Sequence, residues 1–179
     1  MRIALLALIA GLPCLGQQFG AMENLGPNLP TPQLIVRKML EAGHVKPGET
    51  VYDLGSGDGR ILITAAQEFG ARAVGIEILS DLCEKSRRRI KELGLEDRVT
   101  VVEGNALRAD LRSADVVTMC LLTSSNERLR PLLEKSLKLG SRVVTNEFPV
   151  KGWRPFAVDH VREGSMEHII YVYNMGKTK

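Results

Sequence analysis

"VYDLGSGDGR", residues 51–60, is the stretch from which the rest of the chain can be interpreted. Apolar β-forming residues lead to the acid Asp53, a glycine-rich turn follows, and an apolar helical pattern comes next. A strand, a glycine turn and a helix in this order are typical of a doubly wound α/β sheet, in which ligands bind at the carboxyl ends of the strands. Because glycines let the backbone approach a ligand closely, the turn predicts a ligand site beside Asp53.

The remainder of the chain alternates between strand and helix patterns. We expect strands at 50–54, 72–78, 99–103, 115–121 and 141–148, and helices at 59–69, 80–93 and 127–138. An earlier helix is expected to begin at Pro32 with Thr31 as its N-cap, and to end at Gly43. Within 127–138 the regular helix could begin only at Pro131, which interrupts the pattern.

These alternating units predict the fold class. They imply a parallel sheet with helices on both faces and right-handed crossovers. Near the C-terminus, "FAVDHV" (156–161) and "HIIYVY" (168–173) alternate in polarity around the turn residues "REGS", which predicts an antiparallel hairpin. The predicted fold is α/β, with a doubly wound, Rossmann-like sheet of seven strands that is mostly parallel and ends in this hairpin.

The N-terminal residues differ from the rest. "MRIALLALIAGLPCLG" has one basic residue and then an apolar run shorter than the ~18 residues of a membrane-spanning helix, and it resembles the hydrophobic region of a secretory signal. We expect a signal-like or anchoring leader at 1–17, a linker at 18–29 and one folded domain at 30–176. Residues 3–16 would attach the protein to a membrane or to the cell envelope. If the leader is not functional, the location is cytoplasmic.

Composition excludes other classes of function. A chain of 179 residues fits one domain with a substantial core, and a formal charge of +3 provides no long-range field for nucleic acid. Cys14, Cys83 and Cys120 have neither zinc-ligand nor CxxC spacing, and the three histidines are scattered. We therefore expect no metal site and no nucleic-acid partner.

The acid at position 53 discriminates between two ligands. A dinucleotide fingerprint, GxGxxG, would need glycine where Arg60 stands, and Asp53 would repel the pyrophosphate. S-adenosylmethionine carries no phosphate but has an ammonium group and a sulfonium cation, which a carboxylate attracts. The sequence therefore predicts S-adenosylmethionine as the cofactor.

Residues after the next two strands complete this site. Glu77 closes the second strand, where its two oxygens could accept hydrogen bonds from both ribose hydroxyls. Asn105, after the third strand, can accept from the adenine amino group, with Ile78 and Ala106 as apolar neighbours of the ring. The alternatives are that the acids cap the following helices and that Asn105 is a turn residue.

These motifs carry a family resemblance. "VYDLGSGDGR", "AVGIE" and "EGNA", with the closing hairpin, resemble the class I S-adenosylmethionine-dependent methyltransferases over nearly all of 31–175. "PTPQLIVRKML", "VYDLGSGDGRI" and "LKLGSRVVTNEF" are similar to the mitochondrial lysine methyltransferases of adenine nucleotide translocase and the ATP synthase c subunit, and more distantly to Dot1-like lysine methyltransferases. The resemblance implies that Thr31 reaches the methionine end of the cofactor. The complete set of expected cofactor-binding residues is Thr31, Asp53, Gly55, Ser56, Gly57, Glu77, Ile78, Asn105, Ala106 and Leu121.

The chain also departs from those families. Asn105 replaces a common acid, and "CLLTSSN" (120–126) lacks the Asn-Asn-Phe of the Dot1-like group and has Thr123 where the mitochondrial group has proline. These departures concern the substrate more than the cofactor.

The acceptor site is expected at the end of the fourth strand. Methyl transfer needs mainly alignment of the reacting atoms, and a dry, apolar channel lowers the pKa of a lysine without a dedicated base. "CLLT" offers such a lip through Leu121 and Leu122, with Phe148 and Trp153 as possible walls, although core packing explains the two leucines equally well. The Asn/Asp-Pro-Pro-aromatic turn of nucleic-acid amino methyltransferases is absent from the sequence.

We therefore expect an S-adenosylmethionine-dependent methyltransferase that N-methylates a protein lysine, with no catalytic side chain identified. Two alternatives remain at this stage. One is an exported, cofactor-binding module without activity, and the other is a methyltransferase of small molecules. The sequence leaves the oligomeric state open.

Overall fold

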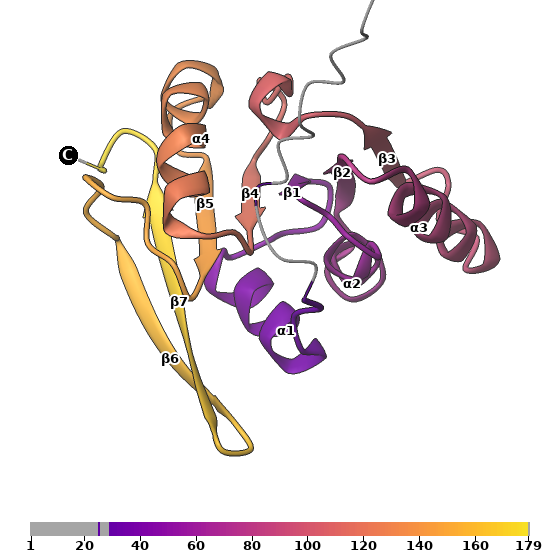
Figure 1. Ribbon diagram of the computed structural model, residues 1–179, viewed down its shortest axis with the longest axis horizontal. Helices are drawn as coiled ribbons and strands as arrows, with labels where there is room; N and C mark the ends of the chain where they lie inside the picture. The colour runs from indigo at the N-terminus through magenta and orange to yellow at the C-terminus, as the bar shows by residue number, and fades with distance from the viewer. Residues whose placement is uncertain (1–24, 26–28, 179) are drawn as a thin grey trace, which may run out of the picture.

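The computed structural model describes residue 25 and residues 29–178, so the expected leader and most of the expected linker lie outside the described residues. One seven-stranded sheet has the order β3-β2-β1-β4-β5-β7-β6 (Figure 1). Its strands are β1 (Thr50–Leu54), β2 (Arg72–Glu77), β3 (Val99–Glu103), β4 (Val116–Met119), β5 (Arg142–Asn146), β6 (Ala157–Glu163) and β7 (Met166–Asn174). Only the pairs that involve β7 are antiparallel, which confirms the predicted fold class.

Helices cover both faces of the sheet. They are α1 (Gln33–Ala42), α2 (Arg60–Phe69), α3 (Ser80–Glu92), the short 3-10 helix η1 (Ala106–Arg108) and α4 (Thr123–Ser136). Apolar residues of α1, α2 and α3 form one buried cluster with one face of the sheet, whereas α4 and η1 contribute to a second cluster on the other face. The strands are buried between these two layers, as their apolar composition requires.

The start of α1 and the course of α4 differ from the prediction. Pro32, not Thr31, is the N-cap of α1, because the carbonyl of Pro32 accepts the first helical hydrogen bond, from Val36 N at 3.0 Å. Pro131 lies inside α4 and does not delay its start. A proline inside a helix costs about 3 kcal/mol, and the burial of Leu129 and Leu133 in the second cluster offsets this cost.

The C-terminal hairpin extends beyond the rest of the sheet. Strand β5 pairs with β7 only over Ile170–Asn174, whereas β6 pairs with β7 from Ala157 to Glu163, where the chain turns (Figure 1). Helix α1 packs against β5, β6 and β7. Among residue 25 and residues 29–178, no helix is both long enough and apolar enough to cross a membrane.

Candidate functional site

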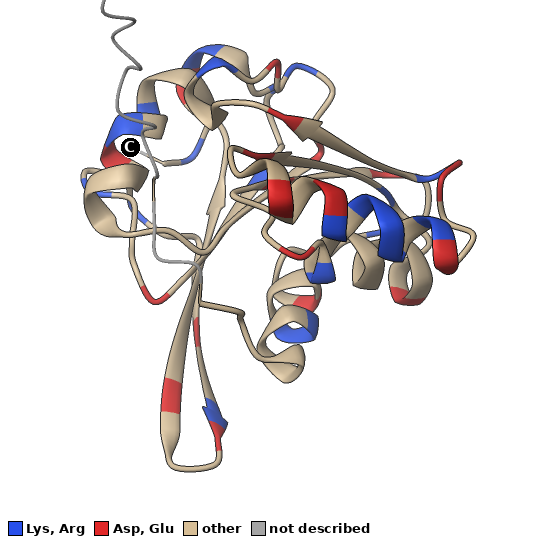
Figure 2. Cartoon of the chain, turned by 45° about the vertical axis from the view of Figure 1, so that its right-hand side comes forward, with Lys and Arg blue, Asp and Glu red and all other residues tan. Residues whose placement is uncertain are grey.

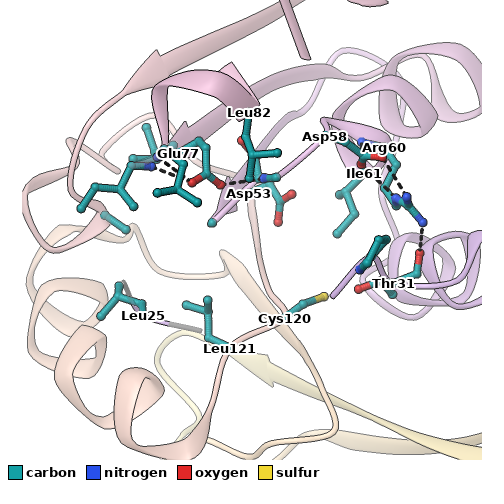
Figure 3. Close-up of a pocket in the computed structure, with 18 of the residues that line it drawn as sticks. Leu25, Thr31, Asp53, Asp58, Arg60, Ile61, Glu77, Leu82, Cys120 and Leu121 are labelled. Atoms are coloured by element: carbon teal, nitrogen blue, oxygen red, sulfur yellow. Dashed lines mark hydrogen bonds and ion pairs between the residues drawn. The ribbon is translucent and has the colours of Figure 1, made fainter. Parts of the chain in front are cut away.

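One pocket lies where the strand order reverses, between β1 and β4. The chain runs from β1 to β2 on one side and returns on the other side as β4, so the carboxyl ends of these strands leave a crevice for a ligand. All ten residues expected to bind the cofactor line this pocket: Thr31, Asp53, Gly55, Ser56, Gly57, Glu77, Ile78, Asn105, Ala106 and Leu121. In Figure 3, Asp53 and Glu77 face Leu25, Leu121 and Cys120 across the pocket.

The glycine turn forms one wall of the pocket. Gly55 and Gly57 have φ angles of 83° and 53°, a left-handed conformation that side chains disfavour. The Gly55 and Ser56 amides both donate to the carbonyl of Ile76, which ties the turn to β2. A Cβ on Gly55 would lie 3.1 Å from Cδ2 of Leu121 and would occupy the space between the two walls. A ligand can therefore approach the backbone here only because position 55 has no side chain.

Asp53 supplies a buried carboxylate at the end of β1. Its side chain is 3% exposed, and Oδ1 accepts a hydrogen bond of 2.7 Å from the Thr118 hydroxyl. Burial raises the pKa of Asp53 to about 7, the Thr118 hydrogen bond opposes this rise, and the negative charges of Glu77 and Asp58 add to it. A positive charge nearby would favour the ionised form of Asp53, and the ammonium or sulfonium of S-adenosylmethionine provides one.

Glu77 is held more tightly than its sequence position suggests. Oε2 accepts from the Gly57 amide at 2.8 Å, and Oε1 accepts from the amides of Ile78 and Leu79 at 2.9 and 3.0 Å. A carboxylate offers about four acceptor positions, and these amides use three of them. Glu77 therefore has one acceptor position left, which can take one ribose hydroxyl at ideal geometry. To accept from both hydroxyls, it would have to share one acceptor position between two donors.

Asn105 has a local structural role. Its Oδ1 accepts from the Leu107 amide at 2.9 Å and caps η1, which is the turn-residue alternative considered from the sequence. An amide oxygen has a second lone pair, so the adenine contact stays a prediction.

Several residues of the pocket were not anticipated. The Arg60 guanidinium binds both oxygens of Asp58 and donates from Nη1 to the Thr31 carbonyl at 2.6 Å (Figure 3). This contact joins the entry to α1 to the glycine turn, and the Asp58–Arg60 spacing within the turn was its only signal in the sequence. Leu25, which falls in the expected linker, also lines the pocket, and its carbonyl accepts a hydrogen bond from the Ser125 hydroxyl.

The four acceptor-channel candidates are not brought together. Leu121 is buried and lines the pocket, whereas Leu122 and Phe148 are 40% and 38% exposed and lie outside the pocket lining. Trp153 is a core residue: its Nε1 donates to Glu134 at 2.8 Å and its ring packs 5.4 Å from that of Tyr173. Trp153 therefore does not form a wall of the channel.

Comparison with known proteins identifies the family. Residues 53–157 match the family model described as the ANTKMT methyltransferase domain. The chain belongs to this family. It is an S-adenosylmethionine-dependent methyltransferase, and its buried Asp53 and open position at Gly55 fit that cofactor.

Three relatives place this methyltransferase more closely. It is 47% identical over 154 residues to a protein-lysine N-methyltransferase of Saccharolobus islandicus, which covers 86% of this chain and 96% of the relative. It is 35% identical to the mouse adenine nucleotide translocase lysine N-methyltransferase, over 73% of this chain and 56% of that protein. The crystal structure of an RNA methyltransferase from Salinibacter ruber with S-adenosyl-L-homocysteine has a TM-score of 0.77 and 42% identity, and the match covers 82% of this chain and 94% of that one.

Proposed function

We propose that this methyltransferase transfers the methyl group to the side-chain nitrogen of a lysine in a protein. The observation that carries the proposal is the apolar end of the pocket, where Cys120 and the 5%-exposed Leu121 face the buried Asp53. The apolar side chains favour a neutral amine over a charged one, and the cationic cofactor offsets the charge of Asp53. The Saccharolobus protein-lysine N-methyltransferase, which matches nearly the whole chain, supports the same acceptor.

The residues present account for binding and alignment. When bound, S-adenosylmethionine supplies an electrophilic methyl carbon on its sulfonium, and the acceptor nitrogen must be held in line with it. The ionised Asp53 attracts the cationic part of the cofactor, and Glu77 accepts from its ribose. Leu121 excludes water from the acceptor side, which favours loss of the lysine proton.

RNA is the acceptor that competes with this proposal, because the Salinibacter structure is of an RNA methyltransferase. Lysine and arginine side chains gather on α3 (Figure 2), namely Lys85, Arg87, Arg88, Arg89 and Lys91. Part of this charge has partners within the domain, since Arg87 donates to the Val101 carbonyl and Arg89 lies 3.9 Å from Asp58. Beyond the acceptor side of the pocket, the half-exposed residues include the apolar Leu122 and Phe148 and the acidic Glu147. An RNA backbone would meet no cation among these three.

One assay separates the two acceptors. The full chain is incubated with S-adenosylmethionine labelled in the methyl group and with separate protein and RNA fractions, and the products are hydrolysed and identified by mass spectrometry. We expect methyl-lysine, formed by the wild type and strongly reduced in Asp53→Asn. Labelled nucleotides without methyl-lysine would overturn the proposal in favour of RNA, and a labelled small molecule would overturn it in favour of that class.

We also propose that residues 3–16, outside the described residues, attach the protein to a membrane or to the cell envelope, with the domain facing the cytoplasm. The apolar composition of this segment and the cytoplasmic supply of the methyl donor support this arrangement. Cell fractionation with N-terminal sequencing tests it. A mature chain that begins at Gln17 in a secreted fraction would contradict the tether.

A further inference from the structure

A second group of polar side chains lies at the end of β5, next to the cofactor pocket. The parallel register pairs Met119 at the end of β4 with Thr145 of β5. Leu121 of the pocket and Glu147 follow these two residues by two positions each, just beyond the ends of their strands, so both lie at the carboxyl edge of the sheet. The sheet thus delivers a carboxylate beside the apolar end of the pocket, on the side away from β1.

The surroundings of Cys120 agree with this placement. Cys120 lines the pocket, and its thiol lies 3.7 Å from the sulfur of Met39 in α1. Burial raises the pKa of Cys120 to about 12; the negative charge of Asp53 adds to the rise, and that of Glu147 makes a smaller contribution in the same direction. The charges of Asp53, in β1, and of Glu147, just after β5, therefore both act on this thiol.

The backbone at Glu147 is held in a strained conformation. Its φ is 66°, and the amide of Phe148 donates to the carbonyl of Asn146 at 2.8 Å. A hydrogen bond across three residues with positive φ at the centre is the rare, strained form of the γ-turn. The buried Asn126 of α4 stabilises this turn by donating from Nδ2 to the Phe148 carbonyl at 2.9 Å. Strain that neighbouring residues maintain in this way is common at functional sites.

The strained turn directs the carboxylate toward one histidine. Val144 belongs to the buried cluster that includes α1, so strict alternation along β5 would point Glu147 to the opposite face. His168 lies on the α1 face, two residues before Ile170 of the same cluster. Oε1 of Glu147 nevertheless lies 2.5 Å from Nδ1 of His168. The left-handed residue thus places its carboxylate where regular strand geometry would not.

This group of side chains has acceptor capacity left for a donor-rich ligand. The Glu147 side chain is 35% exposed, and its contact with His168 occupies one of about four acceptor positions on the carboxylate. The neighbouring Asn146 is 8% exposed, and its Oδ1 has no hydrogen-bond partner among the described residues. A buried acceptor without a donor is costly, and an ammonium group brings three donors and a positive charge.

We propose that Glu147 is a specificity-determining residue that receives the ammonium group of the acceptor lysine. This inference rests on the proposed function and names the acceptor subsite within it. The half-exposed carboxylate captures the charged side chain from solvent. The nitrogen then releases a proton to water and moves into the apolar end of the pocket beside Leu121, where the neutral amine is favoured.

The first test is kinetic and uses Glu147→Gln in the full chain. The substrate is the protein whose lysine the wild type methylates fastest. We expect its KM to rise about ten- to a hundredfold, the loss associated with one charge-assisted hydrogen bond, while kcat and the affinity for S-adenosylhomocysteine change much less. Glu167→Gln is the matched control, because Glu167 lies 3.6 Å from His160 in an exposed pair on the same hairpin. Equal KM values in the two variants would overturn the proposal.

A second variant tests the same role in case Glu147→Gln does not fold. Glu147→Gly removes the carboxylate and adopts a φ of 66° without strain, so this variant should fold even if Glu147→Gln does not. It should show the same rise in KM. A folded Glu147→Gly with the KM of the wild type would equally contradict the proposed role.

The last test does not depend on catalysis. The probe is n-butylammonium, an analogue of the lysine side chain, added to the full chain with S-adenosylhomocysteine while the ring signals of His168 are followed by NMR. We expect the cation to shift these signals in the wild type, the neutral analogue 1-butanol to leave them unchanged, and Glu147→Gln to abolish the effect. No shift, or the same shift in Glu147→Gln, overturns the inference. A shift in a protein that methylates no lysine would instead refute the proposed function and leave the ammonium subsite in place.

Discussion

The Thr118 hydroxyl donates a hydrogen bond of 2.7 Å to Oδ1 of Asp53, its register partner across the β1–β4 pair. This is a neutral donor on a carboxylate that burial would otherwise keep protonated, since the pKa of Asp53 is raised to about 7. The pair marks the point where the sheet reverses its strand order, and the charge of Asp53 is available there for a cationic ligand.

Replacing Asp53 by asparagine should stabilise the protein in the absence of cofactor at alkaline pH. Because the folded pKa lies above the unfolded value of 3.8, this group favours folding fully below that value and loses its contribution as the pH rises through about 7. Asp53→Asn removes the titration and keeps the Thr118 hydrogen bond. At about pH 8 we expect a gain of up to roughly 4 kcal/mol in the free energy of unfolding, and little gain near pH 4. Urea unfolding at both pH values measures it; a loss of stability at pH 8 would mean that the carboxylate is structural.

The same titration should appear in cofactor binding. The cofactor's positive charges favour the ionised form of Asp53, so its binding to the protonated protein must release a proton. The affinity for S-adenosylmethionine should fall by up to tenfold per pH unit below about pH 7. Glu77 and Asp58 are the other acids that raise this pKa. Calorimetry across this range checks the slope, and Asp53→Asn should bind weakly with no such slope. An equal slope in the variant would assign the titration to another group.

Gly55→Ala should impair cofactor binding beyond its effect on stability. The new Cβ would stand 3.1 Å from Leu121 Cδ2, inside the space between the pocket walls, at a φ of 83°. Gly140→Ala is a matched control, because Gly140 has a φ of 84° and no neighbouring atom within 4 Å of an added Cβ. Both variants should lose about 1–2 kcal/mol of stability in thermal unfolding. Only Gly55→Ala should raise the Kd for S-adenosylhomocysteine, and similar Kd values in the two variants would count against a ligand beside the turn.

Glu77→Ala should weaken binding of the cofactor by on the order of 2–3 kcal/mol, the range for a charge-assisted hydrogen bond. It should also lower the thermal stability of the protein, because the amides of Gly57, Ile78 and Leu79 lose their shared acceptor. Calorimetry and thermal unfolding measure the two effects separately. An unchanged affinity in a less stable variant would make Glu77 an organiser of the turn and not a ligand of the ribose.

Trp153→Phe should affect stability and not methyl transfer. The substitution removes the hydrogen bond to Glu134 and reduces the contact with Tyr173, so we expect a loss of about 1–3 kcal/mol in chemical unfolding. The KM for the acceptor should stay at the wild-type value. A raised KM in the folded variant would restore Trp153 to the acceptor channel.

The convergence of the cofactor residues was predictable from the sequence. Asp53, Glu77 and Asn105 each stand at or just after the end of a β-strand pattern, and parallel strands bring their carboxyl ends to one edge of a sheet. Local pattern and topology together are therefore enough to place them around one pocket. The turn at Gly55 is equally local, because it depends on backbone angles within a few residues.

Other features depended on contacts between segments far apart in the chain. Pro131 would interrupt an isolated helix, but packing of the neighbouring leucines on the sheet keeps α4 continuous. Trp153 has the composition of a channel wall, and only its contacts with Glu134 and Tyr173 assign it to the core.

The carboxylate of Glu147, just after β5, depends most clearly on contacts between distant segments. Glu147 and His168 are 21 residues apart and meet only because β7 returns antiparallel beside β5. The left-handed backbone that turns Glu147 toward His168 is one that a non-glycine residue adopts at a cost, so no local propensity predicts it. The sequence alone determined that Asp53, Glu77 and Asn105 stand at or just after the ends of their strands, because strand pattern and turn chemistry act over short distances. Only the tertiary structure decided that Glu147 turns toward His168, because packing from α4 and β7 stabilises a conformation that the local chain disfavours.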